Sequence, residues 1–488
     1  MTDVFPVLRV LGMLIMLFAL AMGVPLAVSW YAQDGVWQVY PLAMGVALLA
    51  GLSLLLSMRR YKRELQPRHG VMLVSLVWAL LPLFAAVPLM LACAQVGRPM
   101  SFTYAYFEAV SGLTTTGSTV LSNLDTLPVS VNVWRTFLQW IGGMGILILA
   151  VAILPLLGVG GAQLFKAEAA GPIKDTKLTP RMTETAKGLW GVYALFSVGC
   201  VLAYWGAGMA PLDALMHMFS TVSLGGLSSH DASFGHFQSP LLEGVALFFM
   251  LLASCNFALY FVAMRKGHWG GFWRDPEMRA TFTALLGGGL VVALLLWVKG
   301  VYGVLDALRY GVFHVVSVAT TTGYATVDYL TWPVFAPVLM LMLSGVATSA
   351  GSTGGGIKMM RMLVLVKQAR RELTRLVHPN AIQPVRVGGA VVDSRMIFSV
   401  LAFMLVYGGT IIVLSMTLLL TDLDPLTAFS AVIASVNCTG PGLGLIGPAS
   451  NYSVLSDFQI WVCTLGMLLG RLEILSFMAL LTPAFWRR

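Results

Sequence analysis

The sequence is poor in charged residues. They make up 10% of its 488 residues, whereas a soluble globular protein carries about 25%. So few charges cannot cover a water-facing surface, which excludes a soluble enzyme, and a hydrophobic share of 58% excludes a disordered chain. The composition therefore predicts a polytopic membrane protein.

Cysteine is scarce as well, and the common motifs of enzymes are missing. The five cysteines lie apart in apolar segments with no CxxC pair, which argues against a disulfide framework or a zinc site. There is no nucleophile elbow, Walker A motif, HExxH motif or dinucleotide fingerprint, so we expect neither catalysis nor an organic cofactor. Four histidines lack the spacing of metal ligands and are interpreted as structural or solvated: His217, His230, His236 and His314.

Long apolar runs, in contrast, are plentiful. A transmembrane helix needs about 20 mainly apolar residues. Ten runs meet this requirement, at residues 8–31, 37–57, 70–94, 134–158, 186–208, 240–264, 280–303, 333–350, 396–420 and 457–483. The first run could be a signal peptide, but it shows no small-residue cleavage pattern, so we interpret it as a retained span.

Basic residues gather on one side of the predicted membrane. Of the 30 lysines and arginines, 25 fall in the two chain ends and in residues 58–69, 159–187, 265–279 and 358–395. Because cytoplasmic loops retain basic residues, both termini are predicted to be cytoplasmic. The net charge of +9 is thus an orientation signal rather than a sign of nucleic-acid binding. The segments 159–187 and 358–395 could dock a partner or bind anionic lipid.

The connections on the opposite side are too long for turns and too apolar for soluble loops. They span residues 99–127, 209–236, 304–329 and 421–452. Each contains a helical stretch of about ten residues, which is half a membrane thickness and indicates a re-entrant half-helix. Asp213, Asp306 and Asp424 near three of the starts are candidate N-caps.

These four connections align with one another. Their polar loops end at Gly117, Gly226, Gly323 and Gly440, and an apolar span stands on each side. The predicted fold is therefore an all-α polytopic membrane protein with four pseudo-repeats of helix, half-helix pore loop and helix around a central pore, plus two extra N-terminal transmembrane helices. The predicted units are residues 1–69 for the two extra helices, then 70–185, 186–278, 279–395 and 396–488.

The loops offer oxygen atoms and no charge. The residues expected to line the ion path are Thr114, Thr115, Thr116 and Gly117, then Ser223, Leu224, Gly225 and Gly226, then Thr320, Thr321, Thr322 and Gly323, and finally Asn437, Cys438, Thr439 and Gly440. Non-helical backbone at membrane depth must be buried or line a water-filled cavity, and a ring of carbonyl oxygens can replace the water shell of a monovalent cation. The alternative is that these small residues only pack helices.

The eighth apolar run is interrupted by glycine. Residues 344–356 contain five glycines, each costing a helix about 1 kcal/mol relative to alanine. A non-helical loop there would obstruct the pore, although a helix-packing face of small residues is the alternative. The candidate gate residues are Gly345, Gly351, Gly354, Gly355, Gly356, Lys358 and Arg471.

Arg471 is the one basic residue that belongs to neither side of the predicted membrane, because it lies well inside an apolar run. A central arginine costs at least about 2.5 kcal/mol by insertion scales, so it needs a polar setting. Glu473 lies two residues away and would not share its helix face. We expect Arg471 to face the pore near the gate and repel cations, the alternative being an anchor to carbonyls of the interrupted span.

Taken together, these motifs carry a family resemblance. They are Thr-Thr-Thr-Gly117-Ser, Ser-Leu-Gly-Gly226-Leu-Ser, Thr-Thr-Thr-Gly323-Tyr, Asn-Cys-Thr-Gly440-Pro, Gly351-Ser-Thr-Gly-Gly-Gly356-Ile-Lys358 and Gly470-Arg471-Leu-Glu473. The chain resembles the membrane subunit of the Trk/Ktr/HKT superfamily, of the bacterial TrkH type, over nearly its whole length. The resemblance implies potassium as the transported ion, the 344–356 loop as the gate, a homodimer, and a separate cytoplasmic nucleotide-binding regulatory subunit.

Glycine at position 117 adds to the expectation of potassium, because serine there goes with sodium permeation in related plant proteins. The departures at Leu224-Gly225 and Asn437-Cys438 argue against a fully four-fold ion site and very strict selectivity. The expected function is potassium uptake across a bacterial inner membrane. A potassium transporter coupled to protons or sodium, and a non-conducting scaffold or sensor, are the alternatives.

Overall fold

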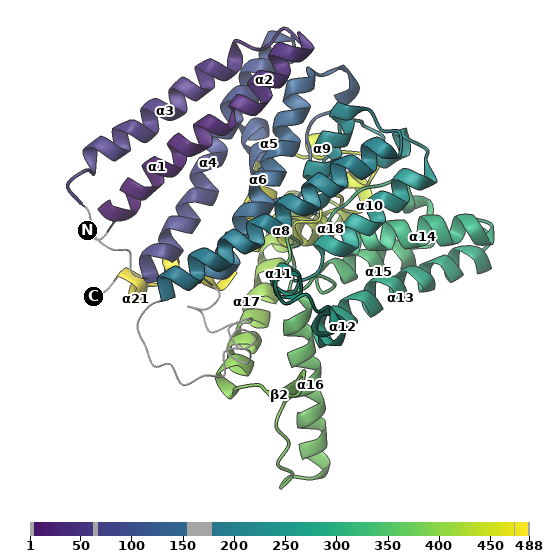
Figure 1. The fold of residues 1–488 in the computed structure, drawn as a ribbon. Helices are drawn as coiled ribbons and strands as arrows, with labels where there is room; N and C mark the ends of the chain where they lie inside the picture. The colour runs from purple at the N-terminus through teal and green to yellow at the C-terminus, as the bar shows by residue number, and fades with distance from the viewer. Residues whose placement is uncertain (1–3, 62–66, 154–177, 473, 487–488) are drawn as a thin grey trace.

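The computed structural model describes residues 4–61, 67–153, 178–472 and 474–486. Within these residues the regular structure is almost entirely helical. The strands are limited to a two-stranded antiparallel hairpin, β1 (Arg386–Val387) and β2 (Ala390–Val391). Figure 1 shows the helices packed as one body, with α16 and the hairpin projecting from its lower end. The predicted all-α polytopic fold is confirmed.

Most of the predicted spans are single helices. Within the described residues, six helical segments are long and apolar enough to cross a membrane. They are α1 (Phe5–Ala21) with α2 (Gly23–Ala32), α3 (Val39–Ser57), α4 (Pro67–Gln95), α8 (Leu178–Gly206), α13 (Pro276–Val298) and α17 (Ser394–Leu419). The 25-residue helix α6 (Val129–Ile153) occupies the fourth predicted run.

Two spans that were predicted as continuous helices are bent pairs, so that part of the prediction was wrong. Helices α10 (Pro240–Ala253) and α11 (Phe257–Lys266) meet at 86°, and α19 (Asp457–Arg471) and α20 (Ile474–Leu481) meet at 107°. At the first bend, the side chain of Asn256 accepts a hydrogen bond from the backbone N–H of Ala258 and starts a new helix. A polar cap inside an apolar run is invisible to a hydropathy average.

The predicted interruption of the eighth span is confirmed. Helix α15 (Phe335–Ser344) ends one residue before Gly345, and α16 (Met359–Val377) begins one residue after Lys358. The backbone between them is non-helical and includes positive φ angles at Gly351, Gly356 and Lys358. We call residues 345–358 the intramembrane loop.

Four short helices lie inside the body formed by the spans. They are α5 (Phe102–Leu113), α9 (Pro211–Val222), α14 (Val304–Ala319) and α18 (Pro425–Asn437). Helix α5 packs against α4 and α6, α9 against α8 and α10, α14 against α13 and α15, and α18 against α17 and α19. Each short helix therefore packs against the spans that precede and follow it in the chain. The residue bounds of the four units stay predictions.

The starts of these short helices differ from expectation. Only Asp424 is an N-cap, accepting a hydrogen bond from the N–H of Thr427 at 2.9 Å. Asp213 and Asp306 lie inside the first turn. Their negative charges interact favourably with the positive end of the helix dipole, but their side chains do not cap the helix. Helix α5 is capped by Ser101, which the sequence analysis overlooked.

The two extra N-terminal spans pack closely at a pair of glycines. A methyl group at Gly12 of α1 would lie 2.8 Å from the carbonyl oxygen of Gly51 of α3, and one at Gly51 would lie 2.7 Å from that of Gly12. Such small-residue contacts let helices approach within a membrane. The remaining elements are α12 (Gly270–Arg274), α21 (Pro483–Trp486) and the 3-10 turns η1 (Leu124–Thr126), η2 (Ser233–His236), η3 (Tyr329–Thr331), η4 (Gly444–Ile446) and η5 (Tyr452–Val454).

Candidate ion pathway

The four loops that follow the short helices share one backbone path. In each loop a non-glycine residue with positive φ is followed two residues later by a glycine with positive φ. The pairs are Thr115 (54°) and Gly117 (85°), Leu224 (55°) and Gly226 (75°), Thr321 (65°) and Gly323 (85°), and Cys438 (56°) and Gly440 (91°). Leucine and cysteine thus adopt the left-handed conformation that threonine adopts in the other two loops. The departures in sequence leave the backbone pattern intact.

The four loops touch one another in a closed ring. A methyl group on Gly117 would overlap the carbonyl oxygen of Gly225, and one on Gly226 would overlap that of Thr322. In the same way, Gly323 faces the carbonyl oxygen of Thr439, and Gly440 faces that of Thr116. The first loop therefore contacts the second, the second the third, the third the fourth, and the fourth the first. The sequence-predicted residues are brought together, and glycine is required for this close approach.

The loops differ in their side-chain oxygens. The hydroxyls of Thr114 and Thr116 lie 2.7 Å apart, and those of Thr320 and Thr322 lie 2.8 Å apart. In the second loop, Ser223 donates to the carbonyl of Phe219 at 2.7 Å, as Thr114 does to that of Val110, but the position that matches Thr116 is Gly225, which has no hydroxyl. The expected departure from four-fold symmetry therefore concerns the side chains of the loops, whereas their backbone conformation is shared.

In the fourth loop, the side chain of Asn437 points toward the spans. Its Oδ1 accepts a hydrogen bond from the hydroxyl of Tyr407 at 2.6 Å, and its Nδ2 donates to the hydroxyl of Ser344 at 3.0 Å. Ser344 is the last residue of α15, so this loop is linked directly to the start of the intramembrane loop.

A polar side chain on each of three short helices holds the segment that follows its loop. Nine residues before the loop glycine stand Glu108, His217 and His314. His217 Nε2 lies 3.0 Å from the hydroxyl of Ser228, and His314 Nε2 accepts from the backbone N–H of Thr326 at 3.1 Å. These two histidines are structural, as predicted.

The first repeat uses an ion pair for the same purpose. Glu108 accepts hydrogen bonds from the backbone N–H of Val120 at 3.1 Å and from the hydroxyl of Thr119 at 3.0 Å. Arg135 of α6 donates to Glu108 at 2.6 Å, and both side chains are fully buried. This pair was not predicted, although the offset of nine residues from the loop glycine, shared with His217 and His314, is a signal that could have revealed Glu108.

Gln139, one turn further along α6, supports the second loop. Its Nε2 donates to the carbonyl of Gly225 at 2.6 Å, and its Oε1 accepts from the N–H of Leu227 at 3.2 Å. The side chain is completely buried. This residue was also missed, because nothing in its local sequence distinguishes it from a residue on any helix face.

The intramembrane loop lies directly against the ring. The hydroxyl of Thr353 donates to the carbonyl of Val222 at the end of α9 at 3.2 Å, and the N–H of Gly355 donates to the hydroxyl of Thr321 at 3.1 Å. A methyl group on Gly355 would overlap the carbonyl oxygen of Asn437 at the end of α18. The loop therefore contacts three of the four short helices at their C-terminal ends.

Two buried charges hold the intramembrane loop in place. Arg471 donates to the carbonyl of Thr353 at 3.0 Å, and Glu277 of α13 accepts from the N–H groups of Ala350 at 2.6 Å and Met360 at 3.1 Å. Both side chains are buried. Arg471 was predicted to lie near the loop and does so, whereas Glu277 was missed. Glu473, the other charge of that motif, lies outside the described residues.

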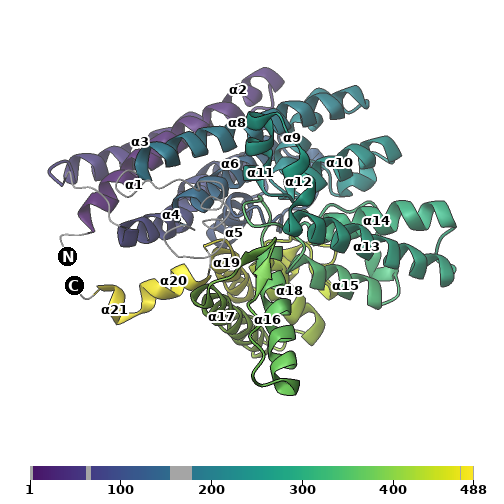
Figure 2. The ribbon, with the colours of Figure 1, turned by 60° about the horizontal axis from the view of Figure 1, so that its bottom comes forward.

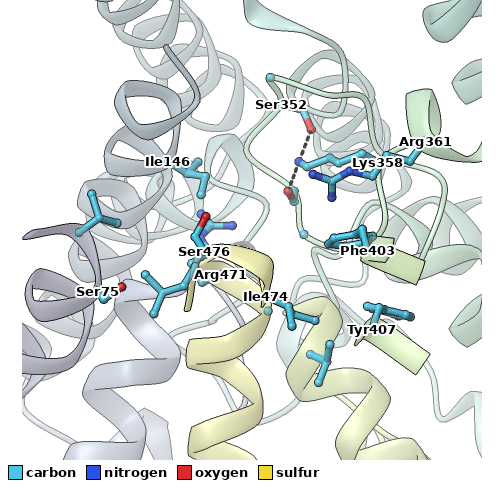
Figure 3. Close-up of a pocket in the computed structure, with 18 of the residues that line it drawn as sticks. Ser75, Ile146, Ser352, Lys358, Arg361, Phe403, Tyr407, Arg471, Ile474 and Ser476 are labelled. Atoms are coloured by element: carbon cyan, nitrogen blue, oxygen red, sulfur yellow. Dashed lines mark hydrogen bonds between the residues drawn. The ribbon is translucent and has the colours of Figure 1, made fainter. Parts of the chain in front are cut away.

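A cavity opens beneath the intramembrane loop (Figure 3). Gly351, Gly354, Gly355 and Gly356 line it. So do three basic side chains, Lys358, Arg361 and Arg471, and no carboxylate is among its described lining residues. Lys358 folds back to donate to the carbonyl of Gly354 at 2.5 Å. Of the predicted gate residues, Gly345 lies outside this lining and contacts Gly356 instead.

A second cavity lies on the other face of the ring. All four loop glycines line it, together with Ser118, His230, Asp231 and Tyr452 from the segments beyond the loops. The ring thus separates a cavity lined by outer segments from one lined by basic residues. Between the ring and the basic cavity stands the intramembrane loop.

The comparisons with known proteins agree with this geometry. Residues 42–487 match the TrkH family, described as a cation transport protein. The chain is 43% identical over 482 residues to the Trk system potassium uptake protein TrkH of Halomonas elongata, covering 99% of each, and 42% identical to the TrkH protein of Escherichia coli K12, covering 98% of each. It superposes on the crystal structure of the potassium transporter TrkH from Vibrio parahaemolyticus with a TM-score of 0.91, at 40% identity and 99% coverage of each chain.

Proposed function

Because the chain belongs to the TrkH family of cation transport proteins, we propose that it takes up potassium ions across a bacterial inner membrane. The observation that carries this proposal is the closed ring of four loops, each glycine of which abuts the next loop. A ring of this kind is the arrangement that can replace the hydration shell of a monovalent cation with backbone oxygens.

The ion path runs through the ring and is lined by residues 114–117, 223–226, 320–323 and 437–440. The loops contain no carboxylate, so their oxygens are neutral and suit a monovalent ion better than a divalent one. Threonine hydroxyls in the first and third loops supply further oxygens. The second loop has one hydroxyl, on Ser223, and the fourth has one, on Thr439, so the loops share backbone oxygens more evenly than side-chain oxygens. The selectivity for potassium over sodium therefore rests mainly on the backbone.

The intramembrane loop is the gate. It stands between the ring and the basic cavity, and it donates hydrogen bonds to the carbonyl of Val222 at the end of α9 and to the hydroxyl of Thr321 in the third loop. Lys358, Arg361 and Arg471 place three positive charges beneath it, which would repel a cation leaving the ring. Opening requires the loop to move away from the ring and the charges to move with it or be screened.

The proposal extends to regulation and assembly. The relatives are named as parts of a Trk system, which supports a separate cytoplasmic nucleotide-binding regulatory subunit. We place both termini in the cytoplasm from the charge bias and take the protein to be a homodimer. The projecting helix α16 is the candidate docking element, whereas most of the other basic segment, 159–187, lies outside the described residues.

The experiment that tests the proposal is rubidium flux into proteoliposomes that contain the purified chain. Flux that follows the membrane potential without a coupling ion supports a gated channel. Flux that needs a proton or sodium gradient would identify a coupled transporter instead. Absence of flux, even with the regulatory subunit present, would favour a scaffold. Repeating the assay with potassium and sodium measures the selectivity.

A further inference from the structure

Three potential metal ligands meet at the outer face of the molecule. The ligands are Asp125 of η1, His236 of η2, and His230, which precedes η2 in the chain. Each offers one ligand atom, and these atoms lie within 4.8 Å of one another. The rings of His230 and His236 are stacked with centroids 3.6 Å apart. The residues come from the first and second outer connections, which are more than 100 residues apart in the chain. Sequence spacing alone did not reveal this cluster.

The two connections are held together independently of the cluster. The backbone N–H of Leu124 donates to the carboxylate of Asp231 at 2.8 Å. This bond lies beside both Asp125 and His230 in the chain, so it fixes the distance between the segments that carry the ligands. The geometry is therefore a property of the packed loops, and the exposed side chains of Asp125 and His236 are free to adjust around an ion.

The chemistry of the cluster suits a borderline-soft divalent cation. Two imidazoles and a carboxylate are the ligand types that bind zinc, with the fourth position left to water. A second carboxylate oxygen, on Asp213, lies 3.5 Å from Nε2 of His230 and can replace the water.

We propose that Asp125, His230 and His236 form a zinc-binding site at the outer mouth, through which external zinc inhibits cation uptake. His230 lines the same cavity as the four loop glycines. A bound divalent cation would therefore add two positive charges near the entrance of the ring and repel incoming potassium. The inhibition rests on the proposed transport function, whereas the site itself does not.

The test measures binding and flux separately. Zinc binding to the purified chain, freed of any affinity tag, is followed by isothermal titration calorimetry, and rubidium uptake by proteoliposomes is measured with increasing external zinc chloride. We expect one zinc ion per chain and inhibition that a chelator reverses. Since loss of an outer-shell partner already costs about 10–100-fold in metal affinity, His236→Asn should weaken both binding and inhibition at least about tenfold.

The control is His378→Asn, which removes an exposed histidine just beyond the end of α16. This variant should keep the zinc affinity and the inhibition of the original chain. Asp125→Asn provides a second variant, and inhibition is expressed relative to the uninhibited flux of each protein. Equal zinc affinity in all variants, or no binding at millimolar zinc, would overturn the site. Binding without inhibition would overturn the inhibitory role, and absence of all flux would count against the transport proposal alone.

Discussion

At the scale of single residues, the ring depends on the absence of four side chains. Gly226 has a φ of 75° and abuts the carbonyl oxygen of Thr322. Gly226→Ala should therefore abolish most of the rubidium flux, because the strained conformation alone costs about 1–3 kcal/mol and the new methyl group forces the two loops apart. Flux into proteoliposomes measures this effect.

The matched control is Gly244→Ala on α10. No atom lies within 4 Å of the position that its methyl group would take, so flux and thermal stability should stay at the original level. If both alanine variants conduct equally well, the close packing of the ring does not matter for the ion path.

Arg471 is a second residue whose effect can be isolated. Arg471→Ala removes a buried positive charge beneath the gate and its bond to Thr353. The flux of the chain without its regulatory subunit should rise severalfold, since both the electrostatic barrier and a tie on the loop are lost. Lower or unchanged flux from a protein that elutes normally in gel filtration would contradict the barrier role and favour a structural anchor.

How far the sequence reveals these residues depends on the distance between partners. The loop glycines and threonines are adjacent in the chain and recur four times, so they could be found by internal alignment. Gln139 and Glu277 could not, because they hold backbone groups 86 and 73 residues away. A lone polar residue in an apolar helix indicates that its side chain has a hydrogen-bond partner, but the sequence does not identify that partner.

At the scale of elements, the intramembrane loop is tied to α13 through Glu277. One carboxylate oxygen accepts two backbone N–H groups, that of Ala350 within the loop and that of Met360 in the first turn of α16. Glu277→Ala would leave both donors without this acceptor at a cost of about 1–3 kcal/mol each. We expect a higher flux in the absence of the regulatory subunit, and faster hydrogen exchange in residues 345–358.

Glu277→Gln should have a smaller effect, because an amide keeps one accepting oxygen. Glu372→Gln on the exposed surface of α16 is the control and should leave the loop unchanged. The same flux in all three variants would show that the loop is held by its other contacts.

Helices whose bounds follow the average hydropathy of the sequence could be predicted. Helix breaks that depend on a single polar contact could not. The spans and the glycine-rich interruption belong to the first class. The bend after Ala253 belongs to the second, because Asn256 caps a helix inside an apolar run. Half-helices were recognised by their length, but only one of the three proposed caps was right.

At the scale of the whole molecule, α16 extends beyond the helical body in both views (Figures 1 and 2). Its exposed arginines include Arg370 and Arg375. If α16 docks the proposed regulatory subunit, Arg370→Glu with Arg375→Glu should weaken binding of that subunit by about tenfold or more, because the charge of the docking surface is reversed. Affinity for the purified subunit is measured at several salt concentrations.

The control reverses two exposed arginines on a different basic segment, Arg59→Glu with Arg60→Glu. This pair should leave subunit affinity intact. If both double variants bind the subunit normally but lose affinity for anionic vesicles, the basic surface of α16 recognises lipid instead.

The order of the ring has a consequence for biosynthesis. Its last contact joins Gly440 to Thr116, more than 300 residues earlier in the chain. Until the last repeat leaves the ribosome, only the contacts of the first loop with the second and of the second with the third can form, so two sides of the ring stay open. Contacts this distant in sequence form late. A chain truncated before the last repeat therefore lacks a complete ring.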